Sequence, residues 1–205
     1  MSDEPQNYIF IVDDDSSMRE SITALLQPCS AQIVTFDSGE AFLEGYQGQR
    51  PACLVTDQRM PGIGGVQMLE TLQERGDRMS IVVITAFADT RSTVRAMKSG
   101  AMNLIEKPFN PQELWDAVQE GLRLDALALE KETKRAACQD LIDNLTESEH
   151  RVMLLLSDGN ANKVIASRLG VSLRTVEGRR ASIFQKLHVD SIAGMMTVYL
   201  ATKDE

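Results

Sequence analysis

The stretch YIFIVDDDSS, residues 8–17, decides how the chain folds, because an unbroken apolar run ends abruptly in three aspartates. Four further short apolar runs follow, at residues 33–36, 52–56, 81–85 and 102–106. The segments after these runs have the apolar spacing of helices, at residues 16–27, 38–47, 65–75, 90–99 and 110–122. Strands that are apolar throughout are buried on both faces. The alternation therefore predicts a doubly wound α/β domain, in which helices cover both sides of a five-stranded parallel sheet.

The composition limits what the protein can be. The 205 residues, 43% apolar and 25% charged, suffice for one large or two smaller globular domains. No apolar segment is long enough to cross a membrane, and the polar, acidic start MSDEPQ is unlike a secretory signal, so we expect a cytoplasmic protein. Cys29, Cys53 and Cys138 are odd in number and far from either histidine, which predicts reduced structural thiols.

Composition changes along the chain indicate two domains. Residues 123–142 contain no glycine or proline, which predicts an exposed helix that prolongs the preceding one and links residues 7–122 to residues 143–204. The last part is purely helical, with expected helices at residues 147–157, 161–169, 173–187 and 191–201. Capping residues support several helix starts: Ser38, Thr90, Pro111 after Asn110, and the capping box of Thr146 and Glu149. Leu122, Leu129 and Ala136 recur at seven-residue spacing, so a dimer contact along this helix is a second expectation beside the linker.

The net charge of −9 is unevenly distributed. Residues 1–124 carry 18 acidic and 10 basic residues, whereas residues 142–205 carry eight of each. One acid, Glu177, stands among six bases in the segment from Lys163 to Lys186. A phosphate backbone responds to charge within a Debye length, so this local basic cluster favours nucleic-acid binding despite the overall acidity.

Polar side chains stand where the apolar runs end. Asp13 and Asp14 end the first run, Asp57 the third, Thr85 the fourth and Lys107 the fifth. Because the carboxyl ends of parallel strands meet at one edge of a sheet, we expect these side chains to converge on a single pocket.

Such a pocket has a definite chemistry. Clustered carboxylates suit Mg²⁺, which prefers oxygen ligands and relieves the repulsion between the acids. Asp57 can then act as a nucleophile toward a phosphoryl group and form an acyl phosphate. Lys107 would stabilise charge on the phosphoryl oxygens, and Thr85 would hydrogen-bond to the new phosphate. Asp15, the third acid of the run, is expected to cap the next helix.

Four motifs resemble those of the receiver domain of two-component response regulators: VDDD at 12–15, VTDQRMPG at 55–62, ITA at 84–86 and EKPF at 106–109. The resemblance covers residues 7–122 and implies a CheY-like fold, a phosphoacceptor at Asp57 and a sensor histidine kinase as donor. It also implies Mg²⁺ ligands at Asp13, Asp14, Asp57 and the backbone carbonyl of Arg59.

One position departs from the receiver pattern. An aromatic residue usually lies three positions before the lysine and moves inward with the threonine, here Thr85, upon phosphorylation. This chain has Leu104 there, so we expect weaker coupling or coupling through Phe87 or Phe109. Phe87 and Arg59 are also expected to shield the acyl phosphate from water.

The segment ANKVIASRLGVSLRTVEGRRASIFQKL, residues 161–187, has a short helix, a turn at Gly170, an N-cap at Ser172 and a longer basic helix. This is the pattern of a helix-turn-helix, whose second helix enters the major groove. A helical bundle with a solvated basic face is the alternative. Residues 143–204 resemble the LuxR-type helix-turn-helix of the NarL/FixJ response regulators, whose domain order the chain also matches.

This second resemblance implies DNA contacts along the two helices. Phosphate contacts are expected from Lys163, Arg174, Thr175 and Lys186. Base-edge contacts are expected from Glu177, Gly178 and Ala181, with Arg179 and Arg180 between these roles.

The resulting hypothesis is a transcription regulator and not a turnover enzyme. Phosphorylation of Asp57 would favour a homodimer that binds double-stranded DNA and acts with RNA polymerase, with no membrane partner. Two alternatives stay open. A constitutive regulator, suggested by Leu104, would ignore phosphorylation, and a Mg²⁺-dependent phosphohydrolase would use the same nucleophile for turnover.

Overall fold

The computed structural model describes residues 6–87 and 90–203, apart from the side chains of residues 90–92. The chain divides into two compact units, Met1–Leu129 and Glu130–Glu205. Helix α5 (Pro111–Asp143) runs without interruption from the first unit into the second.

The first unit is built on a five-stranded sheet with the order β2-β1-β3-β4-β5. Its strands are β1 (Asn7–Val12), β2 (Ala31–Phe36), β3 (Ala52–Asp57), β4 (Ser80–Thr85) and β5 (Asn103–Glu106). Every neighbouring pair is parallel. The predicted doubly wound α/β fold is confirmed, and the carboxyl ends of its strands lie along one edge.

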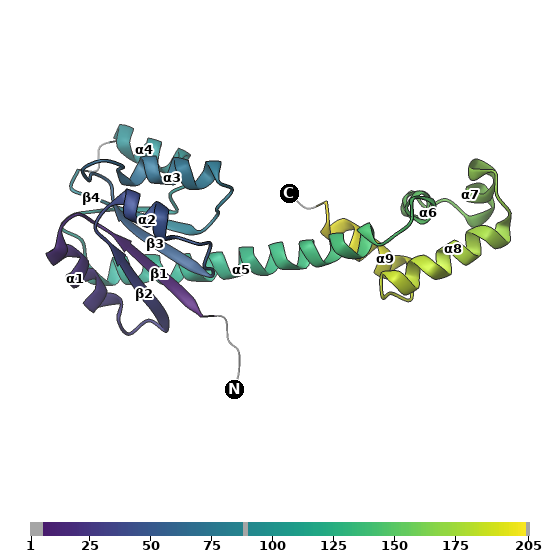
Figure 1. The fold of residues 1–205 in the computed structure, drawn as a ribbon, viewed down its shortest axis with the longest axis horizontal. Coiled ribbons are helices and arrows are strands. Elements are labelled where there is room, and N and C mark those ends of the chain that lie inside the picture. The colour runs from purple at the N-terminus through teal and green to yellow at the C-terminus, as the bar shows by residue number, and fades with distance from the viewer. Residues whose placement is uncertain (1–5, 88–89, 204–205) are drawn as a thin grey trace. The chain divides into compact units, whose positions relative to one another are not determined.

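Helices cover both faces of this sheet (Figure 1). Helix α1 (Ser16–Leu26) and α5 pack on the face that carries Ile9 and Ile11. Helices α2 (Gly39–Gly45), α3 (Gly65–Glu74) and α4 (Thr90–Lys98) belong to the face that carries Phe10 and Val12. Successive side chains of a strand point to opposite faces, so β1 is apolar throughout because both of its faces are buried.

The helix starts confirm several predicted caps. Asp15 is the N-cap of α1, and its carboxylate accepts hydrogen bonds from two backbone N–H groups of the first turn. Ser38 caps α2, and Thr146 forms the predicted capping box with Glu149. Helix α4 begins at Thr90 itself, whose side chain lies outside the described residues, so the cap predicted there stays a prediction.

The second unit is built from helices: α6 (Glu147–Ser157), α7 (Asn162–Leu169), α8 (Leu173–Lys186) and α9 (Ile192–Ala201), after the end of α5. Val152, Ile165 and Ile183 are among the side chains that form its core. Gly170 ends α7 with a φ of 65°, a left-handed conformation that glycine adopts without strain, and Ser172 then caps α8. The helix-turn-helix predicted from the sequence is therefore present.

Helix α5 has 33 residues and unites the predicted fifth helix with the predicted linker. Its first part packs on the sheet through Leu114, Val118 and Leu122, and Asp125 is buried beyond them. From residue 126 to residue 141, all of which the structure describes, no side chain is buried. Among the described helices, including α5, none combines the length and apolarity needed to cross a membrane.

All three thiols are free, as predicted. Cys29 and Cys53 lie in the core between the sheet, α1 and α5, whereas Cys138 is half-buried on α5. Burial raises the pKa of the Cys53 thiol well above its ordinary value. Burial also raises the pKa of Cys29, against a hydrogen bond from the Gln119 amide that lowers it.

Candidate functional site

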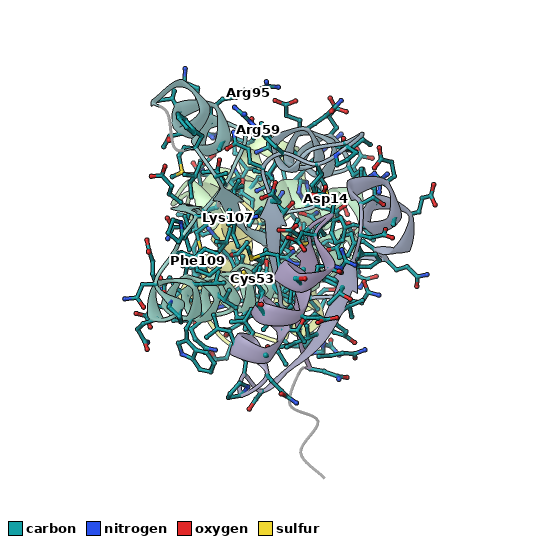
Figure 2. The ribbon with its side chains drawn as sticks, turned by 90° about the vertical axis from the view of Figure 1, so that its left-hand side faces the viewer. Asp14, Cys53, Arg59, Arg95, Lys107 and Phe109 are labelled. Carbon is teal, nitrogen blue, oxygen red and sulfur yellow. The ribbon has the colours of Figure 1, made fainter. Side chains whose placement is uncertain are left out.

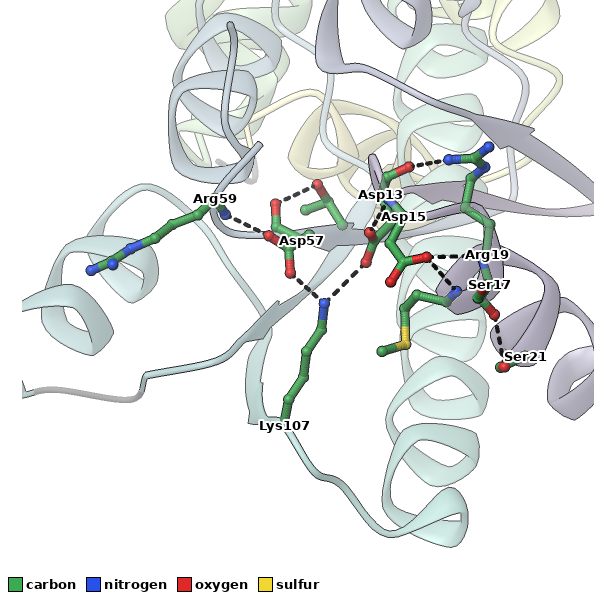
Figure 3. Close-up of polar contacts among 10 residues, drawn as sticks. Asp13, Asp15, Ser17, Arg19, Ser21, Asp57, Arg59 and Lys107 are labelled. Atoms are coloured by element: carbon green, nitrogen blue, oxygen red, sulfur yellow. Dashed lines mark hydrogen bonds and ion pairs between the residues drawn. The ribbon is translucent and has the colours of Figure 1, made fainter. Parts of the chain in front are cut away.

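Three side chains meet at the carboxyl edge of the sheet (Figure 3). Asp13 directly follows β1, Asp57 ends β3 and Lys107 directly follows β5. The Lys107 ammonium donates hydrogen bonds to Asp57 Oδ1 at 2.6 Å and to Asp13 Oδ2 at 3.1 Å. Both aspartates are buried, with 2% of Asp13 and 8% of Asp57 exposed. The strand order therefore brings together residues that are far apart in the sequence.

The electrostatics of this cluster depend on Lys107. Burial by itself would lower the pKa of the ammonium, but hydrogen bonds to Asp57 and Asp13 outweigh it and raise the pKa. Lys107 thus stays charged between two carboxylates. Two acidic side chains and one basic side chain give the cluster a formal net charge of −1. Such a site attracts a further cation and positions the two carboxylates by charge-assisted hydrogen bonds.

Backbone groups fix the remaining oxygens. The N–H of Arg59 donates to Asp57 Oδ2 at 2.7 Å, and the N–H of Asp15 donates to Asp13 Oδ1 at 2.9 Å. The loop after β3 can return so closely because Gly65 has no side chain: a Cβ there would lie 2.6 Å from the Asp57 carbonyl oxygen. The Asp57 carboxylate is consequently held at both of its oxygens, by the Lys107 ammonium and by the backbone N–H of Arg59.

The predicted convergence of all five polar side chains is only partly found. Asp14 is exposed, and no group of three acidic, histidine or cysteine residues in the described part of the chain lies close enough to hold a metal ion. Repulsion explains this, because one ammonium cannot neutralise a third carboxylate beside Asp13 and Asp57. Thr85 is buried at the end of β4, but its hydroxyl exchanges hydrogen bonds of 3.1 Å with the backbone of Phe87.

The structure places the candidate switch residues on different sides of the sheet. Leu104 is half-buried and packs against the core formed with α2, α3 and α4. Phe109 packs against the opposite core, with α1 and α5, whereas Phe87 is 69% exposed. Leu104 is therefore the candidate that faces α4, whereas Phe87 exposes its ring to water and is hydrogen-bonded through its backbone to Thr85.

A small cavity of about 230 Å³ lies next to the loop that follows Asp57. Arg59 and Arg95 both line it, and Figure 2 shows them near each other on the same side of the unit. Arg95 also pairs with Glu70 at 3.3 Å. No sequence signal pointed to Arg95, because only the packing of α4 beside α3 brings it to this cavity.

The second candidate site is the outer surface of α8 and α7. Most of the predicted DNA contacts are exposed there: Lys163, Arg174, Thr175, Glu177, Gly178 and Ala181. Arg179 and Arg180 are half-buried, and the Arg180 guanidinium lies 5.2 Å from the centre of the Phe184 ring. The Thr175 hydroxyl lies 2.8 Å from that of the cap residue Ser172. A helix-turn-helix surface that exposes Lys163 on α7 and Arg174 on α8, with Arg179 and Arg180 half-buried beside them, suits a phosphate backbone.

Lys186 differs from the other predicted phosphate contacts. Its ammonium donates to Glu149 Oε2 at 2.7 Å and to the backbone oxygen of Asn144 at 3.3 Å. The hydrogen bond from Lys186, together with one from Ser182, holds the pKa of the buried Glu149 at about 2. Lys186 thus joins α8 to the start of α6, a role that the sequence did not indicate.

Comparison with known proteins places both sites in one family. Residues 9–119 match the response regulator receiver domain, and residues 143–199 match the luxR family of bacterial regulatory proteins. The chain therefore belongs to the response regulators that join a receiver domain to a LuxR-type DNA-binding domain, the NarL/FixJ family. It is a transcriptional response regulator, and this family implies a kinase and DNA as partners.

Individual relatives match over nearly the full length. The transcriptional regulatory protein FixJ of Azorhizobium caulinodans is 36% identical over 94% of this chain and 91% of its own. The transcriptional regulatory protein TdiR of Thauera aromatica is 34% identical, over 92% and 83%. Among solved structures, response regulator StyR is 39% identical, with a TM-score of 0.86 over 95% of this chain and 98% of its own. Full-length FixJ from B. japonicum is 29% identical, with a TM-score of 0.57 over 98% of both chains.

Proposed function

We propose that phosphorylation of Asp57 switches the DNA binding of this regulator. The observation that carries the proposal is the cluster of Asp13, Asp57 and Lys107, in which a buried carboxylate at the end of β3 is held by an ammonium at 2.6 Å. A sensor histidine kinase is the expected donor, and the cytoplasm the expected location. The proposed partners downstream are double-stranded DNA, a second copy of the chain and RNA polymerase.

In the proposed reaction, a carboxylate oxygen of Asp57 attacks the phosphorus of the donor. An O–P bond forms and the bond from phosphorus to the donor breaks, so the donor leaves with the bonding electron pair. Lys107 stays between the carboxylates and stabilises negative charge on the phosphoryl oxygens. The Thr85 hydroxyl would give up its hydrogen bonds to the backbone of Phe87 and bind a phosphoryl oxygen instead. We expect this movement to change the packing of Leu104 on the α4 face.

The donor set at this edge fits Mg²⁺ chemically, because it offers carboxylate and carbonyl oxygens with excess negative charge. Asp13, Asp14 and Asp57, with the backbone carbonyl of Arg59, would hold the ion, which supplies positive charge opposite the phosphoryl oxygens. Asp14 must turn toward Asp13 for this arrangement, since its side chain is exposed.

The proposal is tested by measuring DNA binding of the full chain with and without acetyl phosphate and Mg²⁺. The DNA would be a duplex selected from a random-sequence pool by the phosphodonor-treated protein. We expect tighter binding after treatment of the wild type and no change for Asp57→Ala. Equal binding of the treated and untreated wild type would contradict the proposal and favour the constitutive alternative.

The constitutive alternative rests on one observation, the aliphatic Leu104 at the position where an aromatic ring is usual. The phosphohydrolase alternative has less support, because residues 143–199 match the luxR family of bacterial regulatory proteins, a DNA-binding domain that a phosphohydrolase would not need. Fast release of phosphate from a phosphomonoester would nevertheless favour it.

A further inference from the structure

A buried ion pair holds α5 to the sheet at the end of the chain's first unit. The Arg50 guanidinium donates to Asp125 through Nε, at 3.1 Å to both carboxylate oxygens, and through Nη2, at 2.8 Å to Oδ1. The backbone N–H of Ala52 donates to Asp125 Oδ2 at 2.7 Å. The Asp125 side chain is fully buried, and that of Arg50 is 11% exposed. The carboxylate is thus fully engaged, as a buried charge must be.

The place of this pair on α5 is informative. Just before it, α5 lies so close to the sheet that a Cβ on Gly121 would be 2.8 Å from the Cys53 sulfur. Just after it, the helix has no buried side chain over residues 126–141, all of which the structure describes, until Ile142 is buried in the second unit. Asp125 is therefore the last buried residue of α5 in the first unit, before the helix continues into the second.

The pair also lies away from the acceptor chemistry. Ala52, which donates to Asp125, begins β3, and Asp57 ends the same strand. Six residues of strand span about 20 Å, so the ion pair and the acceptor occupy opposite edges of the sheet. A change at Asp125 should leave the acceptor cluster of Asp13, Asp57 and Lys107 intact.

We propose that Asp125 is a positioning residue for signalling: through Arg50 it fixes to the receiver unit the start of the part of α5 that buries no side chain, and phosphorylation controls the DNA-binding unit through a helix held there. The proposal rests on the phosphorylation-dependent function proposed above. Its physical reason is that a stretch of helix that buries no side chain gains little stability from packing, so the last buried residue before it determines how firmly the stretch is held.

The test compares Asp125→Asn with Glu120→Gln in the full chain. The first substitution removes the charge of the buried pair. The second removes an exposed pair on the same helix, between Glu120 and Arg123 at 2.7 Å, with both side chains at least half exposed. Hydrogen exchange of the unphosphorylated proteins would show whether amides at residues 126–133 exchange about tenfold faster in Asp125→Asn, the extent expected when a stretch loses its tertiary anchor.

The decisive readout is the ratio of DNA affinities with and without acetyl phosphate and Mg²⁺, measured at equal phosphorylation of Asp57. A residue that only stabilises the receiver would not change this ratio once the folded protein is phosphorylated. We expect Asp125→Asn to lower it about fivefold or more, the size of a typical coupling between sites, and Glu120→Gln to leave it unchanged. An unchanged ratio in Asp125→Asn overturns the proposal.

Two further outcomes stay interpretable. If Asp125→Asn does not fold, as shown by a failure to take up the phosphoryl group, Arg50→Lys replaces it under the same criterion, because lysine keeps the charge but cannot bind both carboxylate oxygens as a fork. If the wild type shows no difference between treated and untreated protein, the proposed function fails, and faster exchange at residues 126–133 in the variant would still support the anchoring role.

Discussion

At the scale of single residues, the acceptor site depends on one ammonium that serves two carboxylates. Lys107 comes from the strand farthest along the chain, yet it contacts Asp13 and Asp57 from the first and third strands. Lys107 thus places one positive charge between two buried carboxylates, where charge-assisted hydrogen bonds hold both of them in position.

Replacing Lys107 tests this dependence. We expect Lys107→Ala to fold but to accept the phosphoryl group from acetyl phosphate about 100-fold more slowly, because a preorganised positive charge at the reacting oxygens is lost. Intact-mass measurement of the phosphorylated fraction over time would give the rate. Lys98→Ala, at an exposed lysine of α4, is the matched control and should keep the wild-type rate. A wild-type rate in Lys107→Ala would contradict the role given to the ammonium.

At the scale of secondary-structure elements, the two glycines inside α5 and α8 have different reasons to be there. Gly121 is required by packing, since a Cβ would lie 2.8 Å from the Cys53 sulfur. For Gly178, inside α8, no atom beyond its own chain neighbours and the adjacent backbone of the helix lies within 4 Å of the place where its Cβ would be. Nothing within the described chain therefore requires glycine at position 178, and its cost in helix stability suits a role toward a bound partner.

This difference gives opposite expectations for two alanine substitutions. Gly178→Ala should raise the free energy of unfolding by about 1 kcal/mol, because alanine is the better helix former, and should weaken binding to the selected duplex. Gly121→Ala should lower the free energy of unfolding through its clash with Cys53. Thermal unfolding and DNA titration would measure both effects. Unchanged DNA affinity in the stabilised Gly178→Ala protein would remove Gly178 from the proposed interface.

Helices α6 and α8 are joined by Glu149, and this contact should depend on pH. The carboxylate accepts from Lys186 and Ser182, and its pKa is lowered to about 2 from an ordinary value near 4.5. A lowered pKa in the folded state means that the stabilisation is present above pH 4.5 and is lost as the pH falls toward 2.

We therefore expect Glu149→Gln to lower the free energy of unfolding by about 1–3 kcal/mol at pH 7, where it breaks a charged, buried hydrogen-bond network. The difference between the wild type and the variant should shrink between pH 4.5 and pH 2. Urea unfolding at several pH values would measure it. Glu147→Gln, at an exposed acid of the same helix, is the control, and a difference independent of pH would argue against the assignment.

At the scale of the whole molecule, the architecture was predictable from the sequence because strands and helices are determined by the periodic spacing of apolar residues. Apolar runs, helical spacing and capping residues gave the parallel sheet, the caps at Asp15, Ser38 and Thr146, and the helix-turn-helix. The roles of Arg50, Asp125 and Lys186 were not predictable, because each partner is tens of residues away in the sequence and no spacing signals such pairs. The exposed position of Asp14 was missed because strand order predicts which residues meet, not which way each side chain turns.

The uneven charge of the chain predicts how DNA binding responds to salt. Each phosphate contact contributes about −0.9 to the slope of log affinity against log salt concentration. We expect Arg174→Ala to make the slope shallower by about that amount on a random-sequence duplex. Lys186→Ala should leave the slope unchanged and lower the unfolding temperature, since it deprives Glu149 of its cation. If the slope became equally shallow in both variants, Lys186 would be a phosphate contact as the sequence predicted.

The unequal burial of the three thiols has a practical consequence. Cys29 and Cys53 are enclosed and their pKa values are raised, so they present little thiolate to an alkylating reagent. Cys138 is half-buried on α5, in the part of this helix that belongs to the second unit. A maleimide dye or spin label added to the native protein should therefore react there first and report, without any engineered cysteine, on motion of the helix that continues from the first unit into the second.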